Sequence, residues 1–499
     1  MKHIVLFGAG KSATVLIDFL LGRAERHDFH LHVVDANLEL AVAKTRDNAN
    51  ASAYGINSDE EKQIDSLVEM ADLVISLLPP HLHLSIAKKC IEFKKHFLNA
   101  SYATPEIREL NVDAEKLGLI FLCEMGLDPG IDHMSAMWMI DGIRARGGKI
   151  TSFKSHCGGL VAPESDDNPW HYKISWNPRN IVFAGKDGAS FLQNGVAIRE
   201  NYYQLFRPER QVSIPGAGNW SWYPNRDSLS YISLYGLEGI QTFIRTTLRH
   251  PDFAFGWKNL IDLKLTDEKI MYDTDGMSLS AFFQIHFDRN GFSEWLQETL
   301  SKRFNNTKEH LEHLIQMIES GKSLSNSDTD LLKDFLVVDE LGKLHDMNME
   351  KVKNSATTKM VSEMNEANLA LKQLFYLGLD SPELINRGTC SAAEVLLYIL
   401  EKRLALSPDD KDMIIMLHEI DYVQDGAKKS MASHFIAKGK DGLYTAMART
   451  VGLPLGIAAL KILDGTISKP GVQIPIHSDI YLPVLAELEK EGIRFVHNF

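Results

Sequence analysis

The first 125 residues alternate between short apolar runs and stretches with helical spacing. The apolar runs have the length of strands buried on both faces, and they lie at residues 4–7, 31–34, 53–56, 72–78, 96–100 and 119–124. Between them, Val15, Leu16, Phe19 and Leu20 recur on one helical face, and a second helix is expected over 82–93. This alternation predicts an α/β fold with a doubly wound parallel sheet.

The rest of the chain follows a different pattern. A helix is expected at about 134–143, and residues 151–235 are rich in turn formers and tryptophan, which favours strands and loops around a cleft. From about 237 to 375 the pattern is largely helical and charged, for example at 309–320, which predicts a helical insert with polar loops at 321–356. The last expected elements are a strand pair at about 411–438, an apolar helix at 447–463 and a final helix at 479–491.

A glycine-rich turn follows the first expected strand and opens the first helix. Its residues are Gly8, Ala9, Gly10, Lys11, Ser12 and Ala13. Gly8 permits a tight turn, Gly10 lets the backbone approach a pyrophosphate, and Ala13 takes the close-packing third position of the GxGxxA form. The helix, beginning near Lys11, then presents its unpaired N–H groups to the phosphates. Such a turn can simply join a strand to a helix, but its position favours a dinucleotide site.

Asp35 closes the second expected strand and bears on the choice of dinucleotide. A carboxylate there can accept both ribose hydroxyls of NAD and would repel the 2′-phosphate of NADP. The nearest downstream arginine is Arg46. The sequence therefore favours NAD and leaves NADP as an option; a solvated aspartate at a strand end is the other reading.

Composition and charge narrow the class of protein. Across 499 residues, 53 Lys and Arg face 66 Asp and Glu, and the net charge of −13 argues against nucleic acid or an anionic membrane as partner. The four cysteines are widely spaced without a CxxC pair, which fits a reducing, cytoplasmic compartment. No apolar run is expected to reach the roughly 18 residues of a membrane helix, and the N-terminus does not resemble a signal peptide.

Longer passages of the chain resemble one known family. They are SYATPE at 101–106, GLDPGIDHMSAM at 126–137, HCGGLVAPESDDNPWHYKISWNPR at 156–179, YPNRDS at 223–228, TTLR at 246–249 and MARTVGLPLGIAALKILDG at 447–465. In these residues and in their order, the sequence resembles the glutamate-forming saccharopine dehydrogenases, also called saccharopine reductases. The resemblance covers nearly the whole chain, and the 156–179 passage is specific.

The resemblance implies a Rossmann-type dinucleotide domain over residues 1–127, completed by about 447–499. It also implies a mixed-sheet α+β substrate domain over 128–446, with the helical insert at 237–375 and a cleft between the domains. The implied reaction is reversible, NAD(P)-dependent oxidation of L-saccharopine to L-glutamate and 2-aminoadipate 6-semialdehyde in lysine metabolism. No reductase domain precedes the first strand, so we expect a stand-alone enzyme. A homodimer is one option that the sequence leaves open.

The resemblance also implies a substrate site. Saccharopine carries three carboxylates, so its pocket needs cations and hydroxyls. Arg226 and Arg249 match carboxylate-binding positions, with Thr247 and Leu248 beside Arg249. Arg245 lies one helical turn before Arg249 and could share its face.

Residues at expected strand ends match positions near the cofactor. Ser101 and Tyr102, after the fifth strand, match positions that touch both substrate and nicotinamide, at the edge where open α/β sheets bind ligands. The remaining expected cofactor contacts are Leu77, Leu78, Pro79, Leu127 and Asp128.

Asp128 also matches the family position that faces the substrate amine. Our hypothesis is that Asp128 tunes the pKa of this amine electrostatically, while Tyr102 or Cys157 assists proton or water placement. His133 and His156 could shuttle protons, although a packing or hydrogen-bonding role is the simpler reading.

Other chemistries and functions find less support in the sequence. His81 and His83 lack further ligands, so no metal site is expected, and hydride transfer needs none. The alternatives are an imine reductase such as carboxynorspermidine dehydrogenase, a catalytically silent dinucleotide-binding regulatory protein and, on the glycine turn alone, a flavin enzyme. Arg226 and Arg249 favour a substrate with several carboxylates, and a silent protein would be expected to lose Asp128 or these arginines.

Overall fold

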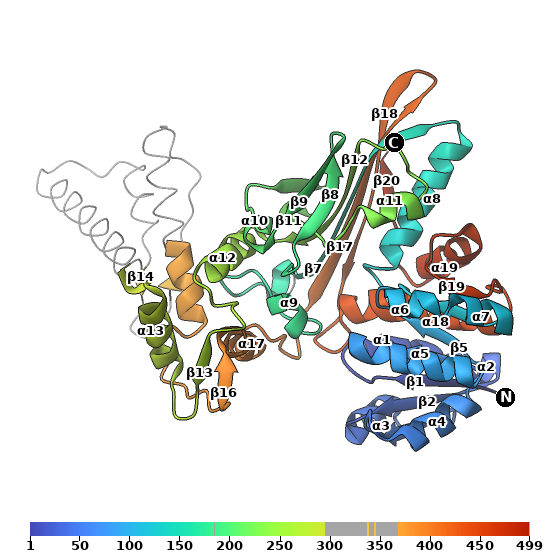
Figure 1. Ribbon diagram of the computed structural model, residues 1–499, viewed down its shortest axis with the longest axis horizontal. Helices are drawn as coiled ribbons and strands as arrows, with labels where there is room; N and C mark the ends of the chain where they lie inside the picture. The colour runs from blue at the N-terminus through green and yellow to red at the C-terminus, as the bar shows by residue number, and fades with distance from the viewer. Residues whose placement is uncertain (184, 295–336, 339–343, 346–367, 499) are drawn as a thin grey trace, which may run out of the picture. The chain divides into compact units, whose positions relative to one another are not determined.

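The computed structural model describes residues 1–183, 185–294, 337–338, 344–345 and 368–498. These residues fall into two compact units, one of Met1–Lys258 with Leu400–Phe499 and one of Asn259–Ile399. The first unit contains both large sheets of the protein (Figure 1).

A seven-stranded parallel sheet forms the N-terminal part of the first unit. Its order is β19-β6-β5-β4-β1-β2-β3, and the strands are β1 (Lys2–Phe7), β2 (Phe29–Asp35), β3 (Ala51–Gly55), β4 (Leu73–Ser76), β5 (His96–Asn99), β6 (Ile120–Leu122) and β19 (Gly471–Gln473). All neighbours pair in parallel, so the predicted doubly wound sheet is confirmed. The order reverses between β1 and β4, and their carboxyl ends form the crevice where such sheets bind ligands.

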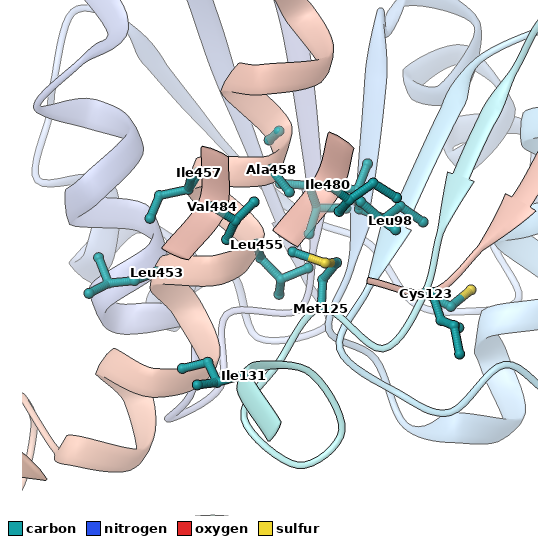
Figure 2. Packing of buried hydrophobic residues seen from close by; sticks show 14 of the residues in the cluster. Leu98, Cys123, Met125, Ile131, Leu453, Leu455, Ile457, Ala458, Ile480 and Val484 are labelled. Carbon is teal, nitrogen blue, oxygen red and sulfur yellow. The ribbon is translucent and has the colours of Figure 1, made fainter. Parts of the chain in front are cut away.

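The C-terminal segment completes this sheet and its helical cover. β19 pairs with β6, and α18 (Ala446–Leu463) packs closely against α1 (Ala13–Leu21). Figure 2 shows apolar side chains of α18 and α19 (Ser478–Lys490) gathered with Leu98 and Met125 in the main core. α18 and α19, although distant in sequence, therefore cover apolar side chains of the N-terminal elements.

The apolar content of α18 corrects one expectation. Among the described residues, α18 is long and apolar enough by length and composition to cross a membrane. However, 78% of its apolar window is buried inside the molecule, as in the core helix of a folded domain.

A nine-stranded mixed sheet forms the rest of the first unit. Its main order is β10-β11-β12-β7-β17-β18-β20, with β8 and β9 attached to β12. The strands are β7 (Lys149–Val161), β8 (Ala189–Gln193), β9 (Val196–Glu200), β10 (Gln211–Ile214), β11 (Gly218–Pro224), β12 (Thr242–Arg249), β17 (Asp412–Gln424), β18 (Ala427–Lys438) and β20 (Val496–Asn498). β12 and β7 are parallel and all other pairs antiparallel. The predicted mixed sheet and the hairpin at 411–438 are thus confirmed.

The predicted helical insert is wrong at its start. Residues 242–249 form β12, which lies between β11 and β7 in the sheet. Seven of its eight positions are buried, so its arginines are interior side chains and not the charged face of a surface helix. The helix predicted at 309–320 lies outside the described residues, and within 321–356 the structure describes only β14 (Val337–Val338) and β15 (Leu344–His345).

The second compact unit, Asn259–Ile399, has its own small core. β13 (Met271–Asp273) pairs with β16 (Thr389–Ser391), and α13 (Leu279–Asn290) lies between them in sequence. The Tyr272 hydroxyl lies 2.6 Å from Nδ1 of His286, which joins β13 to α13.

The remaining described elements are mainly helices. They are α2 (Ala24–His27), α3 (Leu38–Thr45), α4 (Glu61–Met70), η1 (Pro80–Leu82), α5 (His83–Glu92), α6 (Pro105–Glu109), α7 (Asn111–Leu117), α8 (Ile131–Ala145), η2 (Pro163–Ser165), α9 (Arg179–Phe183), α10 (Tyr202–Leu205), α11 (Ser230–Leu234), α12 (Pro251–Asp262) and α17 (Ala392–Arg403). Of these, α8 lies against β7 and β17 and brings its first turn to the mixed sheet.

Candidate functional site

The glycine turn has the geometry that a dinucleotide requires. Gly8 has φ of +102°, and a Cβ there would lie 2.8 Å from the carbonyl oxygen of Leu77, so only glycine fits. A Cβ on Gly10 would meet no protein atom within 4 Å, which leaves open space beside the backbone for a pyrophosphate. α1 begins at Ala13, two residues later than predicted, and its N-cap is Ser12.

Asp35 lies directly at this turn. Its Oδ2 accepts the N–H of Ala9 (2.7 Å) and its Oδ1 accepts the N–H of Asn37 (2.9 Å). Lys44 donates its hydrogen bonds to Gly10 O and Thr14 Oγ1, but its charge also interacts with that of Asp35, whereas Arg46 pairs with Asp18. The Asp35 carboxylate therefore lies at the end of β2, bound to two backbone N–H groups and near the Lys44 ammonium.

The ends of β4 and β5 carry the other predicted cofactor residues. Leu77, directly after β4, donates its N–H to Phe7 O at the end of β1, while Leu78 and Pro79 lead into η1. His83 lies between Ser76 Oγ (2.8 Å) and Ser101 Oγ (2.9 Å), so it fixes Ser101 at the crevice. Burial and the charge of His81 lower the pKa of His83 to about 4, so it bonds as a neutral imidazole.

The segment that follows β6 brings two carboxylates to one arginine of β12. Nη2 of Arg245 donates to Asp128 Oδ1 (2.7 Å) and to Asp132 Oδ2 (2.8 Å), and Arg245 is only 3% exposed. The Gly130 N–H donates to the second oxygen of Asp132 (2.6 Å), at the start of α8. The buried Arg245 therefore binds two carboxylates from the segment between β6 and β7, one before α8 and one in its first turn.

The two carboxyl groups differ in acidity. Burial and the charge of Asp132 raise the pKa of Asp128 to about 6, against the opposing effect of Arg245. Burial also disfavours the charge on Asp132, but His133 and Arg245 outweigh it and lower the pKa of that group. Asp128 is thus the member of the pair that takes up a proton near neutral pH.

Tyr102 completes the arginine–carboxylate cluster. Its hydroxyl donates a long hydrogen bond of 3.5 Å to Asp128 Oδ1, and the guanidinium of Arg226 lies 5.2 Å from its ring centroid. Burial raises the pKa of Tyr102, so the phenol stays protonated and can donate but cannot act as a base. Arg226 itself is exposed and makes no ion pair within the described part of the chain.

A second buried hydrogen-bond network lies next to this cluster, since His133 Nδ1 is 3.6 Å from Asp132 Oδ2. Glu124 Oε2 lies 2.8 Å from His133 Nε2 and accepts the Tyr231 hydroxyl (3.1 Å), while His133 Nδ1 lies 2.5 Å from the Tyr235 hydroxyl. Burial opposes the charge of Glu124, but the bond to His133 lowers its pKa. His133 therefore has a fixed hydrogen-bonding position and not an open path to solvent.

The pairing register assigns the remaining predicted residues to faces of the mixed sheet. Thr247 lies opposite Cys157 on β7, and Arg245 and Arg249 flank Thr247 at even spacing, so these four share one face. Arg245 and Arg249 thus share a face as predicted, but through strand alternation and not a helical turn. Burial and the carboxylates of Asp128 and Asp132 raise the pKa of Cys157, so this cysteine stays a thiol.

Three residues of the same passages face the other side of the sheet. His156 Nδ1 lies 2.7 Å from Thr246 Oγ1, and His156 Nε2 lies 3.2 Å from Glu419 Oε2. Leu248 is fully buried in the separate apolar cluster of that side. His156 therefore lies on the face opposite Cys157 and has two hydrogen-bond partners, in keeping with the simpler hydrogen-bonding role, and the Leu248 side chain is directed away from the face of Arg249.

Arg249 is a buried cation without a carboxylate partner in the part of the chain that is described. It is 5% exposed, and its Nη1 donates to the carbonyl oxygens of Leu248 (2.8 Å) and Gly159 (3.3 Å). Its Nε is buried and finds no acceptor among the described residues. Its guanidinium lies over the rings of Tyr172 (5.1 Å) and Phe253 (5.6 Å). A buried guanidinium held this way is suited to receive an anionic group of a ligand.

Sequence reasoning missed several members of the site. Across more than a hundred positions of sequence, Asp132 binds Arg245, Glu124 binds Tyr231, and Tyr235 binds His133. The only available signal was the spacing of Asp132 four residues after Asp128 in a turn-rich passage. The partners from 231 and 235 carry no local signature, because tertiary packing alone brings them to His133.

A doubly wound sheet with a dinucleotide turn, beside a cluster of buried arginines and carboxylates, defines an oxidoreductase of the Rossmann type. Comparison with family models makes the assignment specific. The saccharopine dehydrogenase NADP binding domain matches residues 4–122, and the saccharopine dehydrogenase C-terminal domain matches residues 126–493. The chain therefore belongs to the saccharopine dehydrogenase family.

Individual relatives agree with this assignment. The chain is 30% identical, over 99% of its length, to the saccharopine dehydrogenase [NADP(+), L-glutamate-forming] of Schizosaccharomyces pombe, of which it covers 98%. It is also 30% identical to the alpha-aminoadipic semialdehyde synthase of Arabidopsis thaliana, of which it covers only 44%. The chain thus spans nearly the whole fungal protein but less than half of the plant protein.

Solved structures show the same fold. The apo saccharopine dehydrogenase (L-Glu forming) of Saccharomyces cerevisiae superposes with a TM-score of 0.77 at 27% identity, covering 100% of this chain and 99% of that one. A homospermidine synthase of Legionella pneumophila, in complex with NAD, shares the fold at a TM-score of 0.52 and 10% identity. The fungal names specify NADP(+), so the preference for NAD predicted from Asp35 finds no support among these relatives.

Proposed function

We propose that the protein catalyses reversible oxidation of L-saccharopine to L-glutamate and 2-aminoadipate 6-semialdehyde. The observation that carries this proposal is Arg249, a buried guanidinium without a carboxylate partner among the described residues, on the same sheet face as the Arg245–Asp128 pair. One carboxylate of a tricarboxylate substrate can pair with Arg249. A substrate with fewer carboxylates does not require this arginine. Family membership and the names of the fungal relatives support the same reaction.

The residues of the cluster have separate roles in this proposal. Arg249 binds one substrate carboxylate, and Arg226, exposed at the rim beside Tyr102, binds another. Asp128 lies where its charge stabilises the protonated secondary amine and, with a pKa near neutrality, accepts the proton that this amine must lose before hydride leaves. Tyr102 donates to Asp128 and holds the carboxylate in place.

The dinucleotide supplies only the hydride acceptor. Hydride leaves the carbon beside the secondary amine, and water adds to the resulting imine and releases glutamate and the semialdehyde. The thiol of Cys157 and the hydroxyl of Thr247, on the same face as Arg249, are the protein groups available to position this water.

We also propose that this chain prefers NAD. Asp35 lies at the end of β2, where Lys44 and Arg46 make their hydrogen bonds to other groups. A ribose 2′-hydroxyl can donate to this carboxylate, and a 2′-phosphate is repelled by it.

Replacing Asp35 by Asn tests the cofactor proposal. We expect the ratio of kcat/KM with NAD to kcat/KM with NADP to fall at least about 10-fold, the equivalent of roughly 1.4 kcal/mol. Asp59→Asn removes the same charge from an exposed position of the same domain and should leave the ratio unchanged. A wild-type enzyme that already prefers NADP would overturn the proposal.

The reaction itself is tested by absorbance of the reduced nicotinamide. Purified protein should reduce NAD or NADP when saccharopine is added, and should turn over carboxynorspermidine far more slowly. Faster turnover of carboxynorspermidine would favour the related imine reductase. No reduction with either substrate and either cofactor would favour a catalytically silent protein.

We also propose a cytoplasmic location and a homodimer. The location rests on the four cysteines, all of which are free. Fractionation and size-exclusion chromatography with light scattering test the two directly.

A further inference from the structure

A cluster of side chains of the types that bind metals includes two residues that lie close to Arg249 in the chain and takes no part in the proposed reaction. His171 lies in the loop between η2 and α9, His250 directly follows β12, and Asp252 is in the first turn of α12. One ligand atom from each of these three residues lies within 4.8 Å of the others. The cluster therefore joins two chain segments that are about 80 residues apart in sequence.

One distance within the cluster matches that around a tetrahedral ion, and the others are longer but within 4.8 Å. Two ligands that are each about 2.0–2.1 Å from a tetrahedral metal lie roughly 3.3–3.4 Å apart. Nε2 of His171 lies 3.3 Å from Asp252 Oδ2, and Nδ1 of His250 lies 3.9 Å from the same oxygen. Nδ1 of His250 accepts the Asp252 N–H at 3.2 Å, and coordination would exchange this bond for the metal.

A fourth residue orients His171 in the way that metal sites require. Its Nδ1–H donates to Asp166 Oδ2 at 2.6 Å, which directs Nε2 toward Asp252. Metal-binding histidines typically donate their second ring N–H to a carboxylate in this manner, which fixes the tautomer and strengthens the ligand. Asp166 is accordingly a positioning residue and not a ligand.

The cluster is open to an incoming ion. The side chains of His171, His250 and Asp252 are 33%, 31% and 35% exposed, so solvent reaches them. Two imidazoles and one carboxylate favour zinc or a neighbouring transition metal over magnesium or calcium, which prefer oxygen ligands throughout.

We propose that His171, His250 and Asp252 bind one divalent transition-metal ion of the zinc class, with a fourth position left to water. The ion clamps the loop that contains His171 to the start of α12. Arg249 lies over the rings of Tyr172 and Phe253, which directly follow two of the ligands, so the clamp also fixes the walls around Arg249.

The metal-free reading of the same residues is an ion pair. Hydrogen bonds from His171 to Asp166 and Asp252 raise the pKa of this imidazole to about 9, so it can bridge the two carboxylates as a cation. The two readings can be distinguished by metal binding. A metal site binds an ion stoichiometrically, and an ion pair does not.

Calorimetric titration of chelator-treated protein with zinc, without substrate or cofactor, tests the proposal independently of the enzyme activity. We expect one ion per chain with a micromolar or tighter Kd. His171→Ala, His250→Ala and the isosteric Asp252→Asn should each weaken binding at least about 100-fold, and Asp166→Asn about 10- to 100-fold. Cobalt should give a visible absorption band in the wild type that these variants lose.

Control variants and a stability readout complete the test. His30→Ala alters another histidine group, formed by His3, His30 and His32 on β1 and β2, and should leave zinc binding intact. Zinc should raise the melting temperature of the wild type and of His30→Ala, but not of Asp252→Asn. Absence of stoichiometric binding in the wild type, or binding lost in His30→Ala and retained in His171→Ala, overturns the proposal.

Discussion

At the scale of single residues, Arg249 combines burial with the lack of a carboxylate partner among the described residues. A charge kept in this state costs stability, and the carboxylate of a bound ligand would offset that cost. The rings of Tyr172 and Phe253 compensate only part of this cost.

Arg249→Met should separate binding from stability. The KM for saccharopine should rise about 100-fold, because charge-assisted hydrogen bonds worth roughly 2–3 kcal/mol are lost. The free energy of unfolding should stay within about 1 kcal/mol of the wild type or increase. Arg249→Lys, which keeps the charge without the planar fork, should give an intermediate KM. Steady-state kinetics and urea unfolding measure both; a large loss of stability with an unchanged KM would assign Arg249 to folding.

The pKa of Asp128 predicts a pH dependence of kcat/KM. Its raised pKa of about 6 means that the carboxyl is protonated below this pH and ionised above it. If the ionised form is required, kcat/KM should rise between pH 5 and pH 7. Asp128→Asn should lower kcat/KM about 100-fold or more and abolish this rise.

The control for the pH experiment is Asp59→Asn, which alters an exposed carboxylate of the dinucleotide domain. It should keep the wild-type profile. An Asp128→Asn variant with unchanged rate and unchanged profile would remove Asp128 from the mechanism.

At the scale of elements, α18 and α1 pack through glycine. A Cβ on Gly452 would lie 2.8 Å from the Leu16 backbone nitrogen, and a Cβ on Gly456 would lie 2.6 Å from the Phe19 ring. The two helices can approach this closely only without side chains at these positions, and the approach attaches the end of the chain to the dinucleotide domain.

Gly452→Ala should therefore destabilise the protein by about 1–3 kcal/mol, the typical cost of forcing extra volume into a packed interface. Gly142→Ala provides the matched control, because Gly142 lies in α8 and its added Cβ meets only the tip of Arg146 at 3.8 Å. In that variant the better helix propensity of alanine should leave stability unchanged or raise it by up to about 1 kcal/mol. Thermal and urea unfolding give both values; equal effects of the two substitutions would contradict the packing argument.

β12 shows where reading elements from sequence fails. Its residues TFIRTTLR combine β-branched side chains with two arginines, and the arginines suggested a charged helix. In the structure both arginines point to one face. Arg245 binds Asp128, 117 positions away, whereas Arg249 binds the carbonyl groups of Gly159, 90 positions away, and of the adjacent Leu248. A functional strand therefore breaks the usual pattern of apolar burial, and only the tertiary partners reveal why.

At the scale of the whole molecule, the dinucleotide fold was predictable and the catalytic cluster only in part. Most strands of the parallel sheet contain a local apolar run, although β3 and β19 do not, and Gly8 and Gly10 follow the first run directly. In contrast, Arg245 meets Asp128 across 117 positions of sequence and Tyr231 meets Glu124 across 107, distances over which spacing carries no information. Resemblance to the family supplied Asp128 and Arg249, but not the Asp132 and Arg245 side chains that, together with burial, set the pKa of Asp128.

The most direct test of the account is the identity of the products formed from saccharopine. Purified wild-type protein, incubated with L-saccharopine and NAD or NADP, should release L-glutamate and 2-aminoadipate 6-semialdehyde in equal amounts with reduced nicotinamide, as measured by mass spectrometry and absorbance. Asp128→Asn and Arg249→Met should form the same products far more slowly. Formation of lysine and 2-oxoglutarate, or no saccharopine-dependent reduction with either cofactor, would contradict the assignment.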